Sequence, residues 1–358
     1  MNTNKTQIGL AHFDELAQEV VRQQKAKRDF VGDPKLMALN PDSQSFHLKT
    51  NGHFEDFRIA DSMHKQLGNK LGIPGKYYDR MRHEQPELLA ANVNVWLQNE
   101  PQKKMIRTLD GTARAFLSNA YRPLDNFDLM NAILPTLRGF TVNGLEIRDC
   151  GLTECRMYLK ATVKTLTAEV RLGDTVEAGI VISNSEIGEG SLRVEPLIFR
   201  LACLNGLISQ HSICRYHVGR RMGEDDGRIE EFFSDQTKHT RDQAFWMQVR
   251  DVVKGTLGDG KWFSEEVNKL KSATEQMISK PKAEVIEIAQ KKFGFNTTET
   301  ESILESLIKS GDYSKYGLAN AVTFTAQGVP DYDRRIDLER TGSDIIELPT
   351  GVWAEMAN

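Results

Sequence analysis

The sequence predicts an α+β fold, in which a twisted antiparallel sheet with a β-β-β-α core is covered by helices and followed by a mainly helical C-terminal region. The first observation is the segment ECRMYLKATVK at residues 154–164, where apolar and polar residues alternate as in a half-buried strand. The second is that two more strand candidates, VEAGIVIS at 176–183 and SLRVEP at 191–196, follow through links too short for a crossover. The third is the helical spacing of apolar residues through the last third of the chain.

The N-terminal third is expected to contain helices with short strands. Asp61 is a suitable N-cap for a helix that stops at Gly72, and Pro74 then precedes a second helix. This pattern is typical of a helix-turn-helix, and the second helix carries basic residues as a DNA-reading helix does: Lys76, Arg80 and Arg82. An ordinary helical hairpin packed on a sheet has the same pattern, so the sequence leaves both interpretations open.

The spacing of apolar residues changes after Pro196. Leu197, Leu201, Leu204 and Ile208 recur at helical intervals. The sequence therefore predicts a helix here, which completes the core of three strands and one helix.

Three helical stripes are expected in the last third. One runs from Ala244 to Val253, the next from Phe263 to Met277, and a third follows a capping box formed by Thr298 and Glu301. With the strand pattern, they divide the chain into four regions: an N-terminal helical and mixed region at 1–115, the sheet-and-helix core at 116–222, an acidic linker at 223–240, and the helical C-terminal region at 241–358.

Composition excludes several classes of protein. The chain has 358 residues, of which 39% are hydrophobic and 27% charged, and this is enough to build a core. No apolar run reaches the roughly 18 residues of a membrane span, and the first residues lack a secretory signal. Four cysteines are too few for a disulfide framework. We therefore expect a cytoplasmic protein with reduced thiols and no membrane partner.

The formal charge of −4 is unevenly distributed. Residues 1–222 carry 29 Lys and Arg against 25 Asp and Glu, whereas residues 223–358 carry 17 against 25. A polyanion is thus expected to meet the first part. The asymmetry also suggests a homo-oligomer built by head-to-tail contacts, or an acidic segment, Glu224 to Asp235, that folds back over the basic residues before it.

The predicted strand at 154–164 has one basic side. Arg156, Tyr158, Lys160 and Lys164 fall on it at intervals of about 7 Å, close to the spacing at which an extended nucleic-acid strand presents bases and phosphates. A later stretch rich in arginine extends the candidate nucleic-acid site with these residues: Arg200, Arg215, Tyr216, His217, Arg220 and Arg221. The plainer interpretations are a solvated sheet face and a loop whose arginines pair with the acidic run that follows.

Catalytic and metal chemistry are less well supported. His211, Cys214 and His217 are close enough in sequence for zinc, but neither a strand nor a helix turns all three the same way, so no metal is expected. Cys203, His217 and Asn205 are the residue types of a thiol hydrolase, and this cysteine-dependent alternative stays open. The sequence has no nucleotide-binding loop of the G-x4-G-K-[ST] or G-x-G-x-x-G type after a strand, so no cofactor is expected.

Three segments carry a resemblance to a known family: SNSEIGEGSLRVEPLIFRLACLNGLI at 183–208, NAYRPLDNFDLM at 119–130, and YGLANAVTFTAQ at 316–327. Over roughly residues 45–330 the chain resembles the phage- and plasmid-like proteins grouped as domain of unknown function number 932. The resemblance implies a protein of a phage, prophage or plasmid, acting in the bacterial cytoplasm, and implies no particular activity. The order of three strands and a helix is also similar to the core of single-strand-annealing recombinases.

The leading hypothesis is a mobile-element protein that binds nucleic acid, and single-stranded DNA in particular, during annealing or recombination. The alternative from a different class is a non-enzymatic interaction protein that targets a host or defence factor through its acidic C-terminal part.

Overall fold

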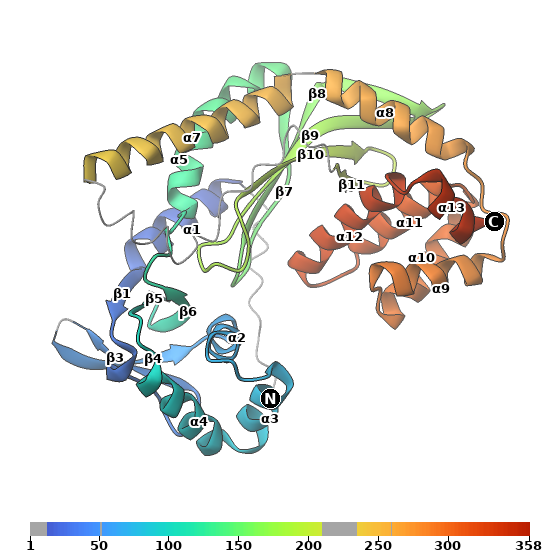
Figure 1. Ribbon diagram of the computed structural model, residues 1–358. Helices are drawn as coiled ribbons and strands as arrows, with labels where there is room; N and C mark the ends of the chain where they lie inside the picture. The colour runs from blue at the N-terminus through green and yellow to red at the C-terminus, as the bar shows by residue number, and fades with distance from the viewer. Residues whose placement is uncertain (1–12, 51, 210–234, 259) are drawn as a thin grey trace.

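The computed structural model describes residues 13–50, 52–209, 235–258 and 260–358. It contains two mainly antiparallel sheets and a helical C-terminal region, which confirms the α+β class (Figure 1). In the described residues no helix is long and apolar enough to cross a membrane. Most of the expected acidic linker at 223–240 lies outside these residues, and helix α7 begins at Asp235.

The first sheet has six strands in the order β1-β5-β6-β4-β3-β2, and only the pairing of β4 with β6 is parallel. Its core side packs against helices α2, α3 and α4 through apolar residues that include Phe46, Phe57 and Phe116. The elements of this part are helix α1 (Phe13–Ala26), β1 (Arg28–Gly32), the short 3-10 helix η1 (Pro34–Leu36), β2 (Met37–Leu39), β3 (Ser45–Thr50), β4 (His53–Ile59), α2 (Asp61–Lys70), α3 (Gly75–Glu84), α4 (Pro86–Asn99), β5 (Lys104–Leu109) and β6 (Thr112–Ser118).

The second sheet is antiparallel throughout, with its strands in the order β11-β10-β9-β8-β7. One side carries Leu159, Ile180 and Ile182 and is covered by α1, α5 and α7 (Figure 1). The elements of this part are α5 (Asn126–Gly139), the 3-10 helix η2 (Thr141–Asn143), β7 (Leu145–Leu152), β8 (Met157–Arg171), β9 (Asp174–Asn184), β10 (Arg193–Arg200), β11 (Asn205–Ile208) and α7 (Asp235–Gly258).

The helix expected over residues 197–208 is wrong. The segment forms the end of β10, a turn, and β11, so that Leu197 pairs across the hairpin with Ile208. Leu204 has a positive φ of 53° and projects into solvent at the turn. The intervals that resembled a helical stripe arise because a short hairpin returns the chain to the same side of the sheet.

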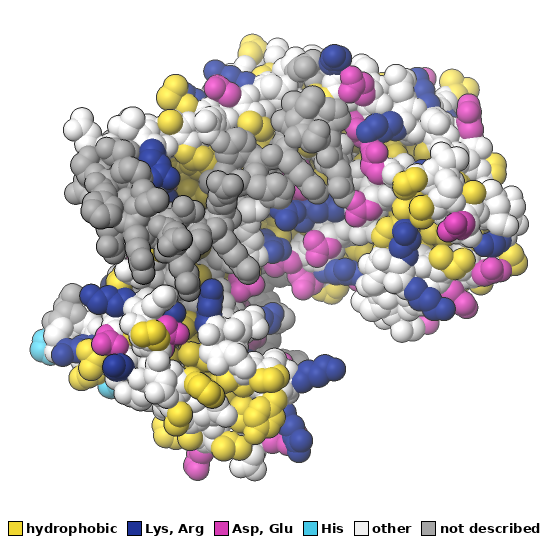
Figure 2. Space-filling view, in the orientation of Figure 1, with side chains coloured by type: hydrophobic (Ala, Val, Ile, Leu, Met, Phe, Trp, Pro, Cys, Tyr) yellow, Lys and Arg dark blue, Asp and Glu magenta, His cyan; other side chains and the backbone are white. Residues whose placement is uncertain are grey.

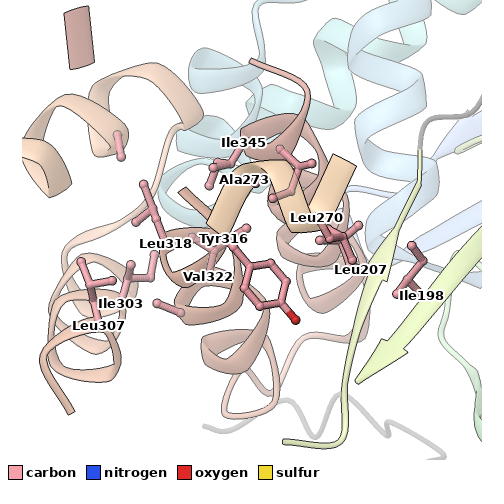
Figure 3. Close-up of a cluster of buried hydrophobic side chains, with 14 of the residues drawn as sticks. Ile198, Leu207, Leu270, Ala273, Ile303, Leu307, Tyr316, Leu318, Val322 and Ile345 are labelled. Carbon is pink, nitrogen blue, oxygen red and sulfur yellow. The ribbon is translucent and has the colours of Figure 1, made fainter. Parts of the chain in front are cut away.

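The C-terminal region is helical, as expected, and shares a core with the second sheet (Figure 3). Ile198 and Leu207 of the sheet meet Tyr316 and Val322 of the helices in one apolar cluster. The capping box lies two residues before the expected one, because Asn296 and Glu299 form it instead of Thr298 and Glu301. The helices are α8 (Gly260–Glu275), α9 (Lys282–Phe293), α10 (Thr297–Ser310), α11 (Lys315–Ala326), α12 (Tyr332–Ile346) and α13 (Thr350–Ala357).

Candidate functional site

Helix α12 covers the basic side of β8, which the sequence predicts to bind nucleic acid. Tyr158 is 0% exposed and Lys160 is 5% exposed. Tyr332 and Ile336 of α12 pack in one apolar cluster with Tyr158. The expectation that this strand side faces solvent is therefore wrong, because a helix more than 170 residues later in the chain lies on it.

Lys160 sits in a buried ion pair with this covering helix. Its Nζ lies 2.8 Å from Oε1 of Glu339 and 3.9 Å from the carboxylate of Asp149. Burial raises the pKa of Glu339, and the charges of Lys160 and Arg340 oppose that rise. The second carboxylate oxygen of Glu339 is buried and makes no hydrogen bond. The pair fixes α12 on the sheet and leaves the amine of Lys160 inaccessible to a phosphate.

The neighbouring residues of the same strand side are also engaged within the protein. The ring of Tyr158 stacks on that of Tyr332 at 4.9 Å between centroids, and its hydroxyl donates to the carboxylate of Asp333. Arg156 lies 3.6 Å from the same carboxylate. Lys164, beyond the covering helix, is exposed and forms an ion pair with Glu146. Of the four predicted residues, Tyr158 and Lys160 are buried, Arg156 directly before β8 is partly exposed, and Lys164 has the most exposed side chain.

Arg200 also forms an ion pair within the protein, with Asp174. Its guanidinium makes two hydrogen bonds to the carboxylate of Asp174, at 2.5 and 2.9 Å, and Tyr316 donates to that carboxylate at 3.0 Å. The remaining predicted nucleic-acid residues lie outside the described residues: Arg215, Tyr216, His217, Arg220 and Arg221.

The described structure contains two of the residues considered for catalysis, Cys203 and Asn205. Cys203 lies in the turn before β11, where Nη1 of Arg200 donates to its Sγ at 3.3 Å. Asn205 turns its amide to Thr323 at 2.5 Å. His217 and the other zinc candidates fall outside the part that can be described. Among described residues, no group of three His, Cys, Asp or Glu is placed to hold a metal ion.

Helices α2 and α3 confirm the expected helical pair. Tyr78 and Met81 point into the core. The Nδ1 of His64 lies 2.8 Å from the Tyr78 hydroxyl, and burial lowers the pKa of His64 to about 3. On the outer side, Arg80 pairs with Glu84 and Arg82 pairs with Asp61. Two of the three basic residues of the expected DNA-reading helix, Arg80 and Arg82, therefore have acidic partners within the protein.

A second strand face, which sequence reasoning missed, is open to solvent. On β3 and β4 the cross-strand pairs Ser45–Arg58, His47–Asp56 and Lys49–Phe54 lie on the side opposite the core. We call this surface the hairpin face, and define it by these residues: Ser45, His47, Lys49, Phe54, Asp56 and Arg58. At the left end of the lower lobe, where Figure 1 shows β3, Figure 2 shows histidine, basic, acidic and hydrophobic side chains beside one another.

The hairpin face centres on an exposed aromatic ring. Phe54 is 52% exposed and stacks on His47, with 4.8 Å between ring centroids and 9° between ring planes. The Nζ of Lys49 lies 5.8 Å from the Phe54 centroid. The Asp56 carboxylate, 2.8 Å from Nδ1 of His47, has its pKa lowered first by that hydrogen bond and then by one from Asn40. The face thus combines a stacking surface with basic groups.

The sequence contained a signal for this hairpin. The segment SFHLKTNGHFEDFRI alternates core and solvent residues on both sides of an Asn-Gly pair, which is the strongest short-range indication of a two-strand hairpin. Gly52 adopts a φ of 90°, which only glycine tolerates readily.

The other half of the outer side of the first sheet is covered by the connection from β9 to β10. Nη1 of Arg107 donates to the carbonyl of Glu186 at 2.6 Å, while its Nη2 donates to Asp125 at 2.8 Å. Gln66 donates to the carbonyl of Ile187 at 2.7 Å. These contacts hold the connection beside β5 and α2, and Ile187 packs against Ala115 and Leu117 of β6. The connection does not cover the hairpin face, where Phe54 is exposed.

Comparison with known proteins gives no match: neither a family model, nor a curated protein, nor a solved structure corresponds to this chain.

Proposed function

We propose that this protein binds single-stranded nucleic acid through the hairpin face. The observation that carries the proposal is Phe54, an aromatic ring half exposed on a sheet and stacked against His47, with Lys49 and Arg58 on the same strand side. An exposed aromatic ring can stack on a flat base, and the basic groups beside it can bind phosphates. This combination favours a ligand with flat rings and negative charge.

The geometry suits a single strand better than a duplex. Residues two apart on a strand are about 7 Å apart, and an extended nucleic-acid strand can place successive bases and phosphates at such intervals. Phe54 offers a π-face to one base, and stacking of this kind is worth about 1–3 kcal/mol per base. Lys49 and Arg58 flank the ring across the two strands, where each can meet a phosphate.

Three features of the sequence support the same class of function. The first 222 residues have the positive balance, and the segment from His211 to Arg221 contains three arginines and no acid. The resemblance to phage- and plasmid-like proteins supports a role in the nucleic-acid metabolism of a mobile element in the bacterial cytoplasm. Recombination or strand annealing is the process that we propose.

A titration tests the proposal directly. Fluorescence anisotropy with a labelled oligothymidine and a duplex of equal length, repeated at several salt concentrations, should show tighter binding of the single strand. The logarithm of the affinity should fall linearly with the logarithm of salt concentration. Absence of binding to single-stranded DNA and RNA at low salt would contradict the proposal.

A further inference from the structure

Helix α4 has an unusual composition for a helix at the surface. Its sequence, PELLAANVNVWLQN, contains one charged residue, Glu87, and apolar residues on more than one side. A surface helix ordinarily has a single apolar stripe and a charged opposite face. Helix α4 therefore has a second apolar side in addition to the one that packs in the core formed by the described residues.

The structure separates the two sides clearly. Leu89, Val93 and Leu97 face the core of the first sheet and are fully buried. On the outer side, Val95 is 59% exposed and Leu88 and Trp96 are each 49% exposed. Figure 2 shows hydrophobic side chains gathered over this helix on the lower lobe, with few charged groups among them.

Two of the donors among these side chains are already paired within the helix. Nε1 of Trp96 donates to Oδ1 of Asn92 at 3.0 Å, and the amide of Asn99 donates to the carbonyl of Val95 at 2.9 Å. Covering this surface would leave these donors paired, so the usual penalty for burying polar groups is small. Removing water from the outer side of α4 would therefore leave these two donors with their hydrogen bonds.

We propose that two copies of this chain associate through the outer sides of their α4 helices, defined by Leu88, Val95 and Trp96. In a two-fold interface the same patch meets itself, so any charge on it meets a like charge. This side of α4 lacks that obstacle, since its only charged residue, Glu87, lies in the first turn at one end. Trp96 provides the large aromatic side chain that most often anchors such contacts.

The expected dimer is weak. One pair of 14-residue helices offers a small contact area beside the roughly 1,200 Å² or more that stable complexes bury, so we expect association only at high protein concentration. This association differs from the head-to-tail contacts suggested by the charge asymmetry, because it is symmetric and apolar. Helix α4 lies on the core side of the first sheet, so a dimer would leave both hairpin faces open.

Sedimentation velocity over a concentration series tests the inference independently of nucleic-acid binding. The average mass should rise from 40.5 kDa toward twice that value. Val95→Glu should abolish the rise, and Leu88→Glu, on the same stripe, should do so as well. The matched control is Ile308→Glu on α10, since Ile308 is 55% exposed and lies on another helix.

A mass of one chain at all concentrations would overturn the inference, as would a dimer that survives both α4 substitutions. Equal loss of association in the Ile308→Glu control would also overturn it. Circular dichroism melting of each variant verifies that the fold is retained, and the two α4 variants guard against failure of either one to fold.

Discussion

Strand β8 and the β3–β4 hairpin carry similar side chains on one side, yet they have opposite environments. Both alternate apolar residues with a mixture of basic and aromatic ones. On β8, Tyr158 and Lys160 are buried under α12, whereas on the hairpin Lys49 and Phe54 face solvent. Alternation along a strand shows which residues share a side, and it does not show what lies over that side.

Burial on β8 and exposure on the hairpin give the two lysine charges different roles. Lys160 is desolvated, so its charge stabilises the fold only while Glu339 compensates for it. Lys49 remains hydrated, so its charge contributes little to stability and stays available to a ligand. The comparison therefore predicts that matched substitutions on the two strands will affect different measurements.

The largest expected effect is on stability at the covered strand. Lys160→Met leaves Glu339 buried without its cation and should lower the free energy of unfolding by about 3–5 kcal/mol at neutral pH. Lys49→Met on the hairpin should change it by less than about 0.5 kcal/mol. Urea denaturation followed by circular dichroism measures both. Similar losses in the two variants would break the comparison.

The loss in Lys160→Met should depend on pH. Burial raises the pKa of Glu339, and removal of the ammonium group raises it further. A carboxyl group whose pKa is higher in the folded state than its unfolded value of about 4.5 holds its proton more tightly when the protein is folded. The folded state is therefore favoured at low pH, and this advantage is lost as the pH rises. The variant should therefore lie closer to the wild type at pH 4 than at pH 7. A second variant, Lys160→Met with Glu339→Leu, should recover most of the stability and lose this pH dependence.

The next effect is on binding at the open hairpin. Phe54→Ala removes one stacking surface and should weaken binding of single-stranded DNA by about 1–3 kcal/mol, or roughly 5- to 150-fold. The matched control is Phe324→Ala on α11, because Phe324 is 46% exposed and lies in the C-terminal helices. Anisotropy titration at one salt concentration compares them, and equal weakening in both would count against a specific role for Phe54.

A smaller effect concerns the salt dependence of binding. Lys49→Ala with Arg58→Ala removes two proposed phosphate contacts, so the slope of log affinity against log salt should fall by about 1.4, or roughly 0.7 per contact on a single strand. Lys291→Ala with Lys292→Ala removes the same charge from α9. If the control lowers the slope as much as the hairpin variant, net charge accounts for binding.

The smallest expected effect is at the helical pair. Arg80 is already paired with Glu84, so Lys76→Ala with Arg80→Ala should change single-strand affinity by less than about 2-fold. Titration against both single- and double-stranded DNA distinguishes the two interpretations that the sequence left open. A large loss confined to the duplex would identify α3 as a DNA-reading helix.

Local patterns in the sequence predicted much of the fold. Residue spacing predicted the class, strands at 154–164 and 176–183 that correspond to parts of β8 and β9, the helical pair and the helical C-terminal region. The expected caps were less accurate, because Ala60 and not Asp61 is the N-cap of α2, and Asn296 with Glu299 forms the capping box of α10. The helix at 197–208 was wrong because a tight hairpin and a helix can produce the same apolar intervals.

The environment of the candidate site could not be predicted in the same way. The cover over β8 depends on contacts such as Lys160 with Glu339, which are 179 residues apart, and no local pattern reports them. The hairpin could have been predicted from the sequence, because an Asn-Gly pair lies between two segments in which apolar and polar residues alternate. Its exposure depends on where the β9–β10 connection ends, and this is a property of the tertiary structure.

The most direct test is to locate bound nucleic acid on the chain. A single-stranded oligonucleotide containing 5-iodouracil can be cross-linked to the wild-type protein by light, and the modified peptide identified by mass spectrometry. The proposed function predicts the principal cross-link at Phe54 or elsewhere on β3 and β4. A principal cross-link at Tyr158, on α3 or within residues 210–234, with none on the hairpin, would contradict it.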